Sequence, residues 1–140
     1  MRDRNPVRKA LKKEAPIVMV CPHKGKTGLR RLMNAAGYSV SGLRSAFRLE
    51  SAFRQELGLA AVLLPAALFM HVTAIAKALL MASVILVLVV ELLNTAIEAA
   101  VDRISMEDHE LAKLAKDYGS AAVMLSVACM VMVWAVVLLA

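Results

Sequence analysis

The sequence predicts an all-α membrane protein in which three transmembrane helices follow an amphipathic helix at the membrane surface. Hydrophobic residues make up 60% of the 140 residues and the mean hydropathy is +0.66, which is high for a soluble domain. Three long apolar runs also follow one another in the second part of the chain. Because lipid forces the backbone groups of each spanning segment to pair within that segment, these runs predict a helical bundle.

Charge is divided unevenly along the chain. Residues 1–54 contain 13 Lys and Arg against three acidic residues, whereas residues 55–140 contain four against eight. A basic arm before an apolar remainder is typical of a cytoplasmic segment near anionic lipid. Basic segments also bind nucleic acid, but no nucleic-acid-binding module accompanies this one, so we expect no nucleic-acid partner.

Residues 1–28 are basic and contain three prolines, and we interpret them as a largely disordered cytoplasmic tail. Residues 29–140 are then a single integral-membrane domain. It begins with a predicted surface helix at 29–48, where apolar residues recur with helical spacing at Leu29, Leu32, Met33, Ala36, Val40, Leu43 and Phe47. Arginines lie off this stripe, which predicts an amphipathic helix in the membrane interface, with Gly37 and Gly42 as candidate breaks.

The three spans are expected near residues 53–72, 78–101 and 118–140. The first contains Pro65, a residue type that commonly kinks helices. The uncharged part of the second, Ala78 to Val90, is too short to cross alone. It must continue as helix through Glu91 and Glu98 to reach about 20 residues.

The connections between these spans predict the orientation. The loop after the first span carries one lysine, whereas the region 102–117 carries Arg103, Lys113 and Lys116. Positive residues accumulate on the cytoplasmic side, so this region and the N-terminus are expected in the cytoplasm and the C-terminus outside.

Four polar residues follow the apolar part of the second span, namely Glu91, Asn94, Glu98 and Asp102. At about 100° per residue they lie within an arc of roughly 80° on one helix face. Burying ionisable groups at a membrane boundary is costly, so such residues are functional candidates. The alternative is a polar seam that joins helices. Asn94 is a candidate catalytic residue that either orients a glutamate or serves as such a seam.

The cytoplasmic rim of the predicted bundle holds further charged groups. Lys116 and Asp117 open the third span, Glu50 precedes the first, and Arg31 lies in the surface helix. Carboxylates such as Glu98 favour Mg²⁺, which binds through one or two of them together with substrate phosphates. Phosphoryl transfer depends mainly on positioning and charge stabilisation, so this set of residues could perform it without a soluble kinase fold.

The two glutamates of the stripe differ in depth. Glu91 lies seven residues before Glu98, roughly 10 Å further along the helix toward the membrane interior. A partly desolvated carboxylate at that depth suits a general base for a hydroxyl on a lipid headgroup. The hypothesis is therefore a nucleotide above the interface and a lipid alcohol within it, with Glu98 as the alternative base.

Several segments resemble the prokaryotic diacylglycerol kinases. They are ELLNTAIEAAVDRIS at 91–105, HELAKLAKDYGSAAV at 109–123, AAGYSVSGLRSAF at 35–47 and ESAFRQE at 50–56. The resemblance runs from about Thr27 to the C-terminus. It implies a homotrimer of three-span subunits in the bacterial inner membrane, with active sites shared between subunits. It also implies transfer of the γ-phosphate of ATP to diacylglycerol, which gives phosphatidic acid.

The resemblance implies roles for individual residues. Glu91 is the implied proton acceptor, and Glu50 and Glu98 are the implied ligands of the Mg²⁺ that accompanies ATP. The implied nucleotide contacts are Arg31, Tyr38, Glu50, Glu98, Glu107, Asp108, His109, Lys116 and Asp117. The implied lipid contacts are Arg31, Glu91 and Ser120.

The sequence departs from the family pattern in its longer basic arm, in Val40 where an aromatic residue is common, and in Asn34 where a basic one is. Two alternatives stay open. A related branch phosphorylates undecaprenol and shares the main segments, although AAGYS and AFRQE favour the diacylglycerol branch. A non-enzymatic trimeric channel or transporter would need no ATP site, so replacing Lys116 or Glu50 would leave its function intact.

Overall fold

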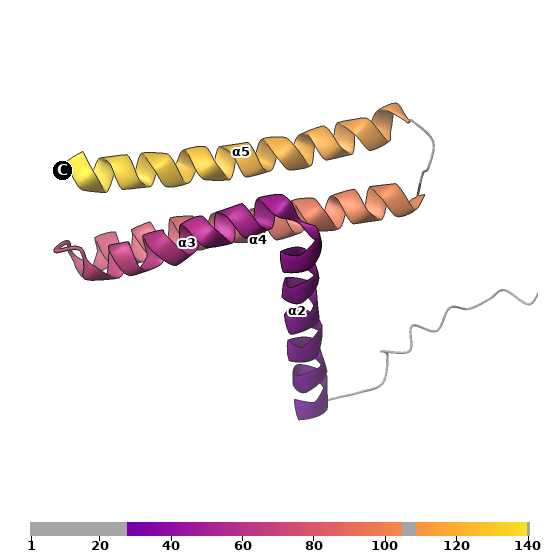
Figure 1. Cartoon of the computed structure of the whole chain (residues 1–140), viewed down its shortest axis with the longest axis horizontal. Helices are drawn as coiled ribbons and strands as arrows, with labels where there is room; N and C mark the ends of the chain where they lie inside the picture. Colours follow the sequence, from indigo (N-terminus) through magenta and orange to yellow (C-terminus); the bar gives the residue numbers. More distant parts are fainter. Residues whose placement is uncertain (1–27, 105–108, 140) are drawn as a thin grey trace, which may run out of the picture. The chain divides into compact units, whose positions relative to one another are not determined.

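The computed structural model describes residues 28–104 and 109–139, and every element in these ranges is a helix (Figure 1). The helices are α2 (Leu29–Leu49), α3 (Ser51–Phe69), α4 (Ala74–Ile104) and α5 (Glu110–Leu139). The predicted all-α class is therefore confirmed. The chain divides into two compact units, with the boundary between Tyr38 and Ser39 inside α2.

Helix α2 is continuous, and neither Gly37 nor Gly42 interrupts it. The residues of the predicted apolar stripe from Leu32 onward are exposed, with Met33 at 68% and Val40 at 66% of their full accessibility. An apolar face next to arginines on the same helix is suited to the boundary between lipid headgroups and acyl chains.

A single residue separates α2 from α3. Glu50 has an extended backbone (φ −100°, ψ 119°) and is the N-cap of α3, but its side chain makes no capping hydrogen bond. Arg54 supports this corner, because its Nη1 donates to the backbone oxygens of Phe47 and Arg48, each at 3.2 Å. These bonds satisfy carbonyls at the end of α2 that have no partner within the helix.

Three helices are long and apolar enough to cross a membrane: α3, the segment Ala74–Arg103 of α4, and α5. Helix α4 runs without a break through Glu91 and Glu98, as predicted. Pro65 lies inside α3.

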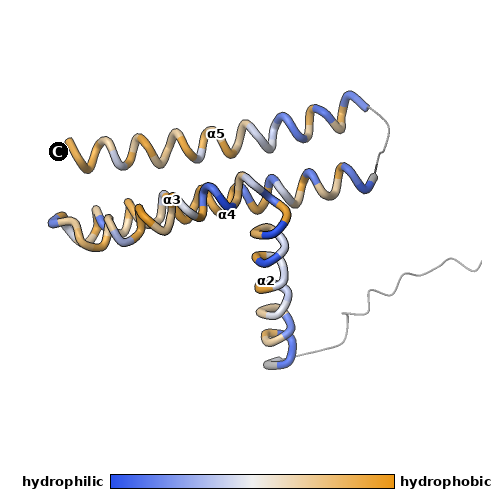
Figure 2. Tube along the Cα trace, in the orientation of Figure 1, coloured by the Kyte–Doolittle hydropathy of each residue, from blue (hydrophilic) through white to orange (hydrophobic). Residues whose placement is uncertain are grey.

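The third membrane-spanning helix is longer at its start than the predicted span. Helix α5 begins at Glu110, whereas the span was predicted from near residue 118. The segment ELAKLAKD was assigned to the connection between the spans because it is rich in charged residues. It nevertheless consists mainly of strong helix formers. The side chain of His109 also caps this end, since its Nδ1 accepts a hydrogen bond from the backbone N–H of Leu111 at 3.2 Å. Figure 2 shows that hydrophilic residues gather on α4 and α5 at the ends nearest to each other in sequence.

A short connection holds α3 and α4 together at their other ends. Thr73 caps α4, because its Oγ1 accepts a hydrogen bond from the N–H of Ala76 at 3.2 Å. Lys77 Nζ donates to the backbone oxygen of Leu68 at 2.9 Å, which places a cation at the negative end of α3.

Helix α4 packs against both α3 and α5, as Figure 1 shows. The core of this contact consists of Ala60 from α3, Val84 and Val87 from α4, and Met130 from α5. The buried residues of α5 (Gly119, Ser126 and Met130) share one face of that helix by their spacing. This packing brings the polar end of α4 beside the first turns of α5.

Candidate active site

The polar stripe on α4 is graded in exposure. Glu91 is buried, at 4% of its full accessibility, whereas Asn94 and Glu98 are half-buried. The side chain of Asp102, at the far end, is 64% exposed. The stripe therefore runs from the protein interior to the surface, which agrees with the gradient of depth predicted from the spacing.

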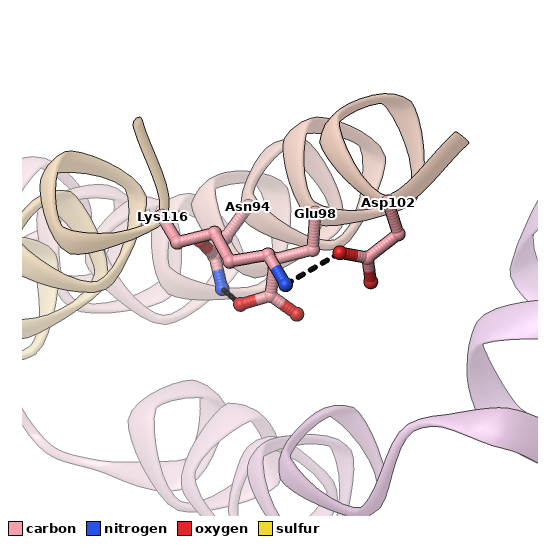
Figure 3. Close-up of polar contacts among 4 residues, drawn as sticks. All are labelled: Asn94, Glu98, Asp102 and Lys116. Carbon is pink, nitrogen blue, oxygen red and sulfur yellow. Dashed lines mark hydrogen bonds and ion pairs between the residues drawn. The ribbon is translucent and has the colours of Figure 1, made fainter. Parts of the chain in front are cut away.

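Asn94 connects the stripe to the neighbouring helix. Its Nδ2 donates a hydrogen bond to Glu98 Oε1 at 3.1 Å (Figure 3). Its Oδ1 is buried and accepts no hydrogen bond from any described residue. This oxygen faces α5 at Gly119, where the chain has no side chain to displace it. The amide of Asn94 therefore contacts a glutamate on its own helix and lies against a second helix, without a hydrogen bond from its oxygen to α5 in the described residues.

Lys116 joins the same group of side chains from α5. Its Nζ lies 2.5 Å from Asp102 Oδ1 (Figure 3), so the early turns of α5 lie beside the outer end of the stripe. The charge of Glu98 also acts on Lys116. The side chain of Lys116 is 40% exposed, so it is not closed off from a phosphate on the aqueous side.

Four carboxylates from α4 and from the start of α3 interact electrostatically. The charges of Glu98 and Glu50 both act on Glu91, and that of Glu91 acts on Glu56. Like charges in a partly buried cluster repel one another, so a cation would stabilise the arrangement. A cationic ligand at this end of the bundle would reduce that repulsion.

Sequence reasoning did not select Glu56. This residue is half-buried, and its Oε2 is buried without a hydrogen-bond partner in the described part of the chain. The sequence did contain a signal, because Glu56 lies inside the predicted span 53–72. An ionisable residue is costly to place in a membrane span, which makes it a functional candidate.

The carboxylates fit a metal that arrives with phosphate better than a metal held by protein alone. Within residues 28–104 and 109–139, no group of three or more His, Cys, Asp or Glu side chains could hold a metal ion. Mg²⁺ bound with a nucleotide needs only one or two carboxylates, because phosphate oxygens and water supply the remaining ligands. Glu50, whose carboxylate is not used as a helix cap, and Glu98 provide such oxygen atoms.

The other predicted site residues occupy different places. Asp117 and Ser120 are exposed near the start of α5, beside Lys116 and Gly119 respectively. His109 caps α5 through its side chain. Arg31 and Tyr38 are exposed on the first part of α2, which belongs to the other compact unit. The predicted contacts Glu107 and Asp108 lie outside the described residues.

Comparison with known proteins identifies the family. The family model described as "Prokaryotic diacylglycerol kinase" matches residues 37–138. The chain is 51% identical over 118 residues to a diacylglycerol kinase of Pseudomonas aeruginosa, covering 84% of this chain and 96% of that one. It is also 51% identical over 113 residues to a diacylglycerol kinase of Escherichia coli strain K12, covering 80% and 92% of the two chains.

A diacylglycerol kinase of Haemophilus influenzae is 48% identical over 108 residues, covering 77% of this chain and 92% of that one. The matched region includes α3, α4 and nearly all of α5, and all the polar residues placed together above, from Glu50 to Lys116. The expected resemblance is therefore confirmed, and the chain belongs to the prokaryotic diacylglycerol kinase family.

Proposed function

We propose that this chain transfers the γ-phosphate of ATP to the free hydroxyl of 1,2-diacylglycerol, which gives phosphatidic acid at the cytoplasmic face of the bacterial inner membrane. The observation that carries the proposal is the identity of about half of all aligned residues with relatives named diacylglycerol kinase, across nearly their whole length. Undecaprenol is not favoured as the acceptor, because the relatives compared here are all named for diacylglycerol.

Glu91 is the proposed general base. Its carboxylate accepts the proton of the lipid hydroxyl while the hydroxyl oxygen forms a bond to the γ-phosphorus. The bond from that phosphorus to the β–γ bridging oxygen breaks, and ADP leaves with its electron pair. The burial of Glu91 supports this role, because a site closed to water favours transfer to the lipid over hydrolysis of ATP.

The remaining site residues receive roles in binding. Glu50 and Glu98 are the proposed ligands of Mg²⁺, which when bound would neutralise part of the phosphate charge. Lys116 is the proposed cation for the phosphate oxygens, supported by its partly exposed side chain beside the stripe. The proposed further nucleotide contacts are Arg31, Tyr38, Glu107, Asp108, His109 and Asp117. Arg31 and Ser120 are the proposed lipid contacts.

The assembly and orientation are also proposals. We infer a homotrimer with its N-terminus in the cytoplasm, in which residues 29–140 are the membrane domain. The tail predicted at 1–28 lies, apart from residue 28, outside the described residues. Large apolar side chains on the outer faces of the spans support the assembly, because these faces can contact lipid or other copies of the chain. The positive residues near the polar end of the bundle support the orientation.

The proposal is tested with purified protein in mixed micelles and ATP labelled at the γ-phosphate. Diacylglycerol and undecaprenol are supplied in parallel reactions, each with Mg²⁺ or with excess chelator. We expect labelled phosphatidic acid only when Mg²⁺ and diacylglycerol are both present. Faster labelling of undecaprenol would overturn the substrate assignment, and no labelling of either lipid would overturn the kinase function.

A further inference from the structure

Gly119 differs from the other glycines in the described part of the chain. At Gly28, Gly37, Gly42 and Gly58 an added Cβ would meet no atom within 4 Å. At Gly119 a Cβ would overlap Asn94 Oδ1 and would lie 3.2 Å from Asn94 Cγ. The absence of a side chain at this position therefore lets α5 approach α4 at the level of the polar stripe.

The amide of Asn94 is enclosed between this glycine and a glutamate. Its oxygen lies against Gly119, and its nitrogen donates to Glu98 Oε1 at 3.1 Å. Reversing the amide would place an oxygen against the carboxylate oxygen, where two acceptors repel each other. The hydrogen bond thus decides which end of the amide faces Glu98, and the close approach of α5 limits the space in which the amide can move.

The same contact lies near the proposed phosphate-binding lysine. Lys116 is three residues before Gly119, on the adjacent turn of α5, and pairs with Asp102 on α4 at 2.5 Å. A side chain at position 119 would have to displace either the amide or the whole turn. Both changes would alter the alignment of α5 with the carboxylates of α4.

We propose that Gly119 is a positioning residue for Glu98, acting through Asn94. The close approach of α5 holds the Asn94 amide, and the amide holds the carboxylate of Glu98 in the orientation that receives the metal–nucleotide complex. The inference rests on the proposed function, because it assigns Glu98 to that complex. It adds a residue that touches neither substrate nor metal and lies on a different helix from the ligand it orients.

The test compares Gly119→Ala with Gly58→Ala. Both changes add one methyl group within a helix and both favour helix formation. Only the first meets a neighbouring side chain within the chain. Residues that orient a metal ligand typically contribute roughly 10- to 100-fold to metal affinity or activity. We expect Gly119→Ala to raise the Mg²⁺ concentration for half-maximal activity, or to lower kcat, by that factor, and Gly58→Ala to change neither by more than about twofold.

Two readouts separate positioning from general packing. Positioning predicts that the apparent KM for diacylglycerol stays within about twofold of wild type and that the thermal unfolding midpoint matches that of Gly58→Ala. Binding of a fluorescent ATP analogue, measured with and without Mg²⁺, should weaken only when Mg²⁺ is present. A fall in the unfolding midpoint with parallel changes in every kinetic constant would overturn the inference.

A double-mutant cycle tests the route through Asn94. In an Asn94→Ser background the amide is gone, so adding Gly119→Ala should cause no further loss of Mg²⁺-dependent nucleotide binding. Additive losses would show that Gly119 acts by another route. If the wild-type protein phosphorylates no lipid, the proposed function itself is wrong. If the wild type is active and Gly119→Ala has the same Mg²⁺ dependence and kcat as Gly58→Ala, only this inference is wrong.

Discussion

Both halves of α4 contain buried side chains, but these side chains differ in their chemistry. In the half before Glu91, Leu80, Val84 and Val87 have exposed fractions of 0%, 3% and 4%. In the second half Glu91 is also only 4% exposed. Burying an apolar side chain is favourable by itself. Burying a carboxylate is not, so its presence calls for a function or a ligand. One helix therefore supplies both the core and the proposed catalytic groups.

The largest expected effect comes from removing the buried carboxylate. Glu91→Gln keeps the size of the side chain but cannot accept the lipid proton, so turnover should fall by roughly 10²- to 10⁴-fold. The measurement is the initial rate of phosphatidic acid formation. Glu110→Gln, an exposed position on the first turn of α5, is the control and should keep the wild-type rate. Equal rates for the two variants would remove Glu91 from the chemistry.

A change in the apolar half should affect stability and leave the chemistry intact. Leu80→Ala should lower the free energy of unfolding by about 2–5 kcal/mol, because Leu80 is fully buried and a cavity remains. Leu79→Ala is the matched control, because Leu79 is the neighbouring leucine and its side chain is 53% exposed. Unfolding midpoints in detergent measure both. If Leu80→Ala lowered turnover of the folded protein as strongly as Glu91→Gln, the proposed difference in role between the apolar and polar halves of α4 would be wrong.

The corner between α2 and α3 should show a smaller effect on stability. Arg54→Met removes the donor to the backbone oxygens of Phe47 and Arg48, so we expect a loss of about 1 kcal/mol. Arg48→Met leaves its own carbonyl in place and is the control. Unfolding midpoints again provide the measurement, and identical midpoints for the two variants would show that the hydrogen bonds of Arg54 contribute nothing.

The exposed end of the stripe should show the smallest effect. Asp102→Asn weakens the ion pair with Lys116, and exposed pairs contribute little, so the KM for ATP should change by less than roughly fivefold. Asp102→Glu keeps the charge and should match wild type. If Asp102→Asn instead abolished turnover, the functional groups would extend further toward the surface than we propose.

The sequence was sufficient to predict the stripe on α4, because all four residues lie on one element and helical geometry fixes their relative angles. The contact between Asp102 and Lys116 is consistent with the order of the chain, since consecutive helices joined by a short connection bring these ends together. The start of α5 at Glu110 could not be predicted from the sequence, because charged residues occur in both helices and loops.

The contact between Asn94 and Gly119 could not be predicted from the sequence either. It depends on how far α5 is shifted along α4, and this shift is set by packing between the helices, including that of Met130 against Val84 and Val87. Local periodicity defines which face of a helix is buried but not which residue of the partner lies opposite. The residues of a site on one helix are thus easier to predict than those on a neighbouring helix.

The most direct test of the account measures nucleotide binding and turnover for Glu91→Gln and Glu98→Gln in matched preparations. We expect Glu91→Gln to lose turnover but to bind ATP with Mg²⁺ as tightly as wild type. We expect Glu98→Gln to lose the Mg²⁺-dependent part of binding as well as turnover. The reverse pattern, with binding lost in Glu91→Gln and kept in Glu98→Gln, would contradict the proposed division between a buried base and a half-buried metal ligand.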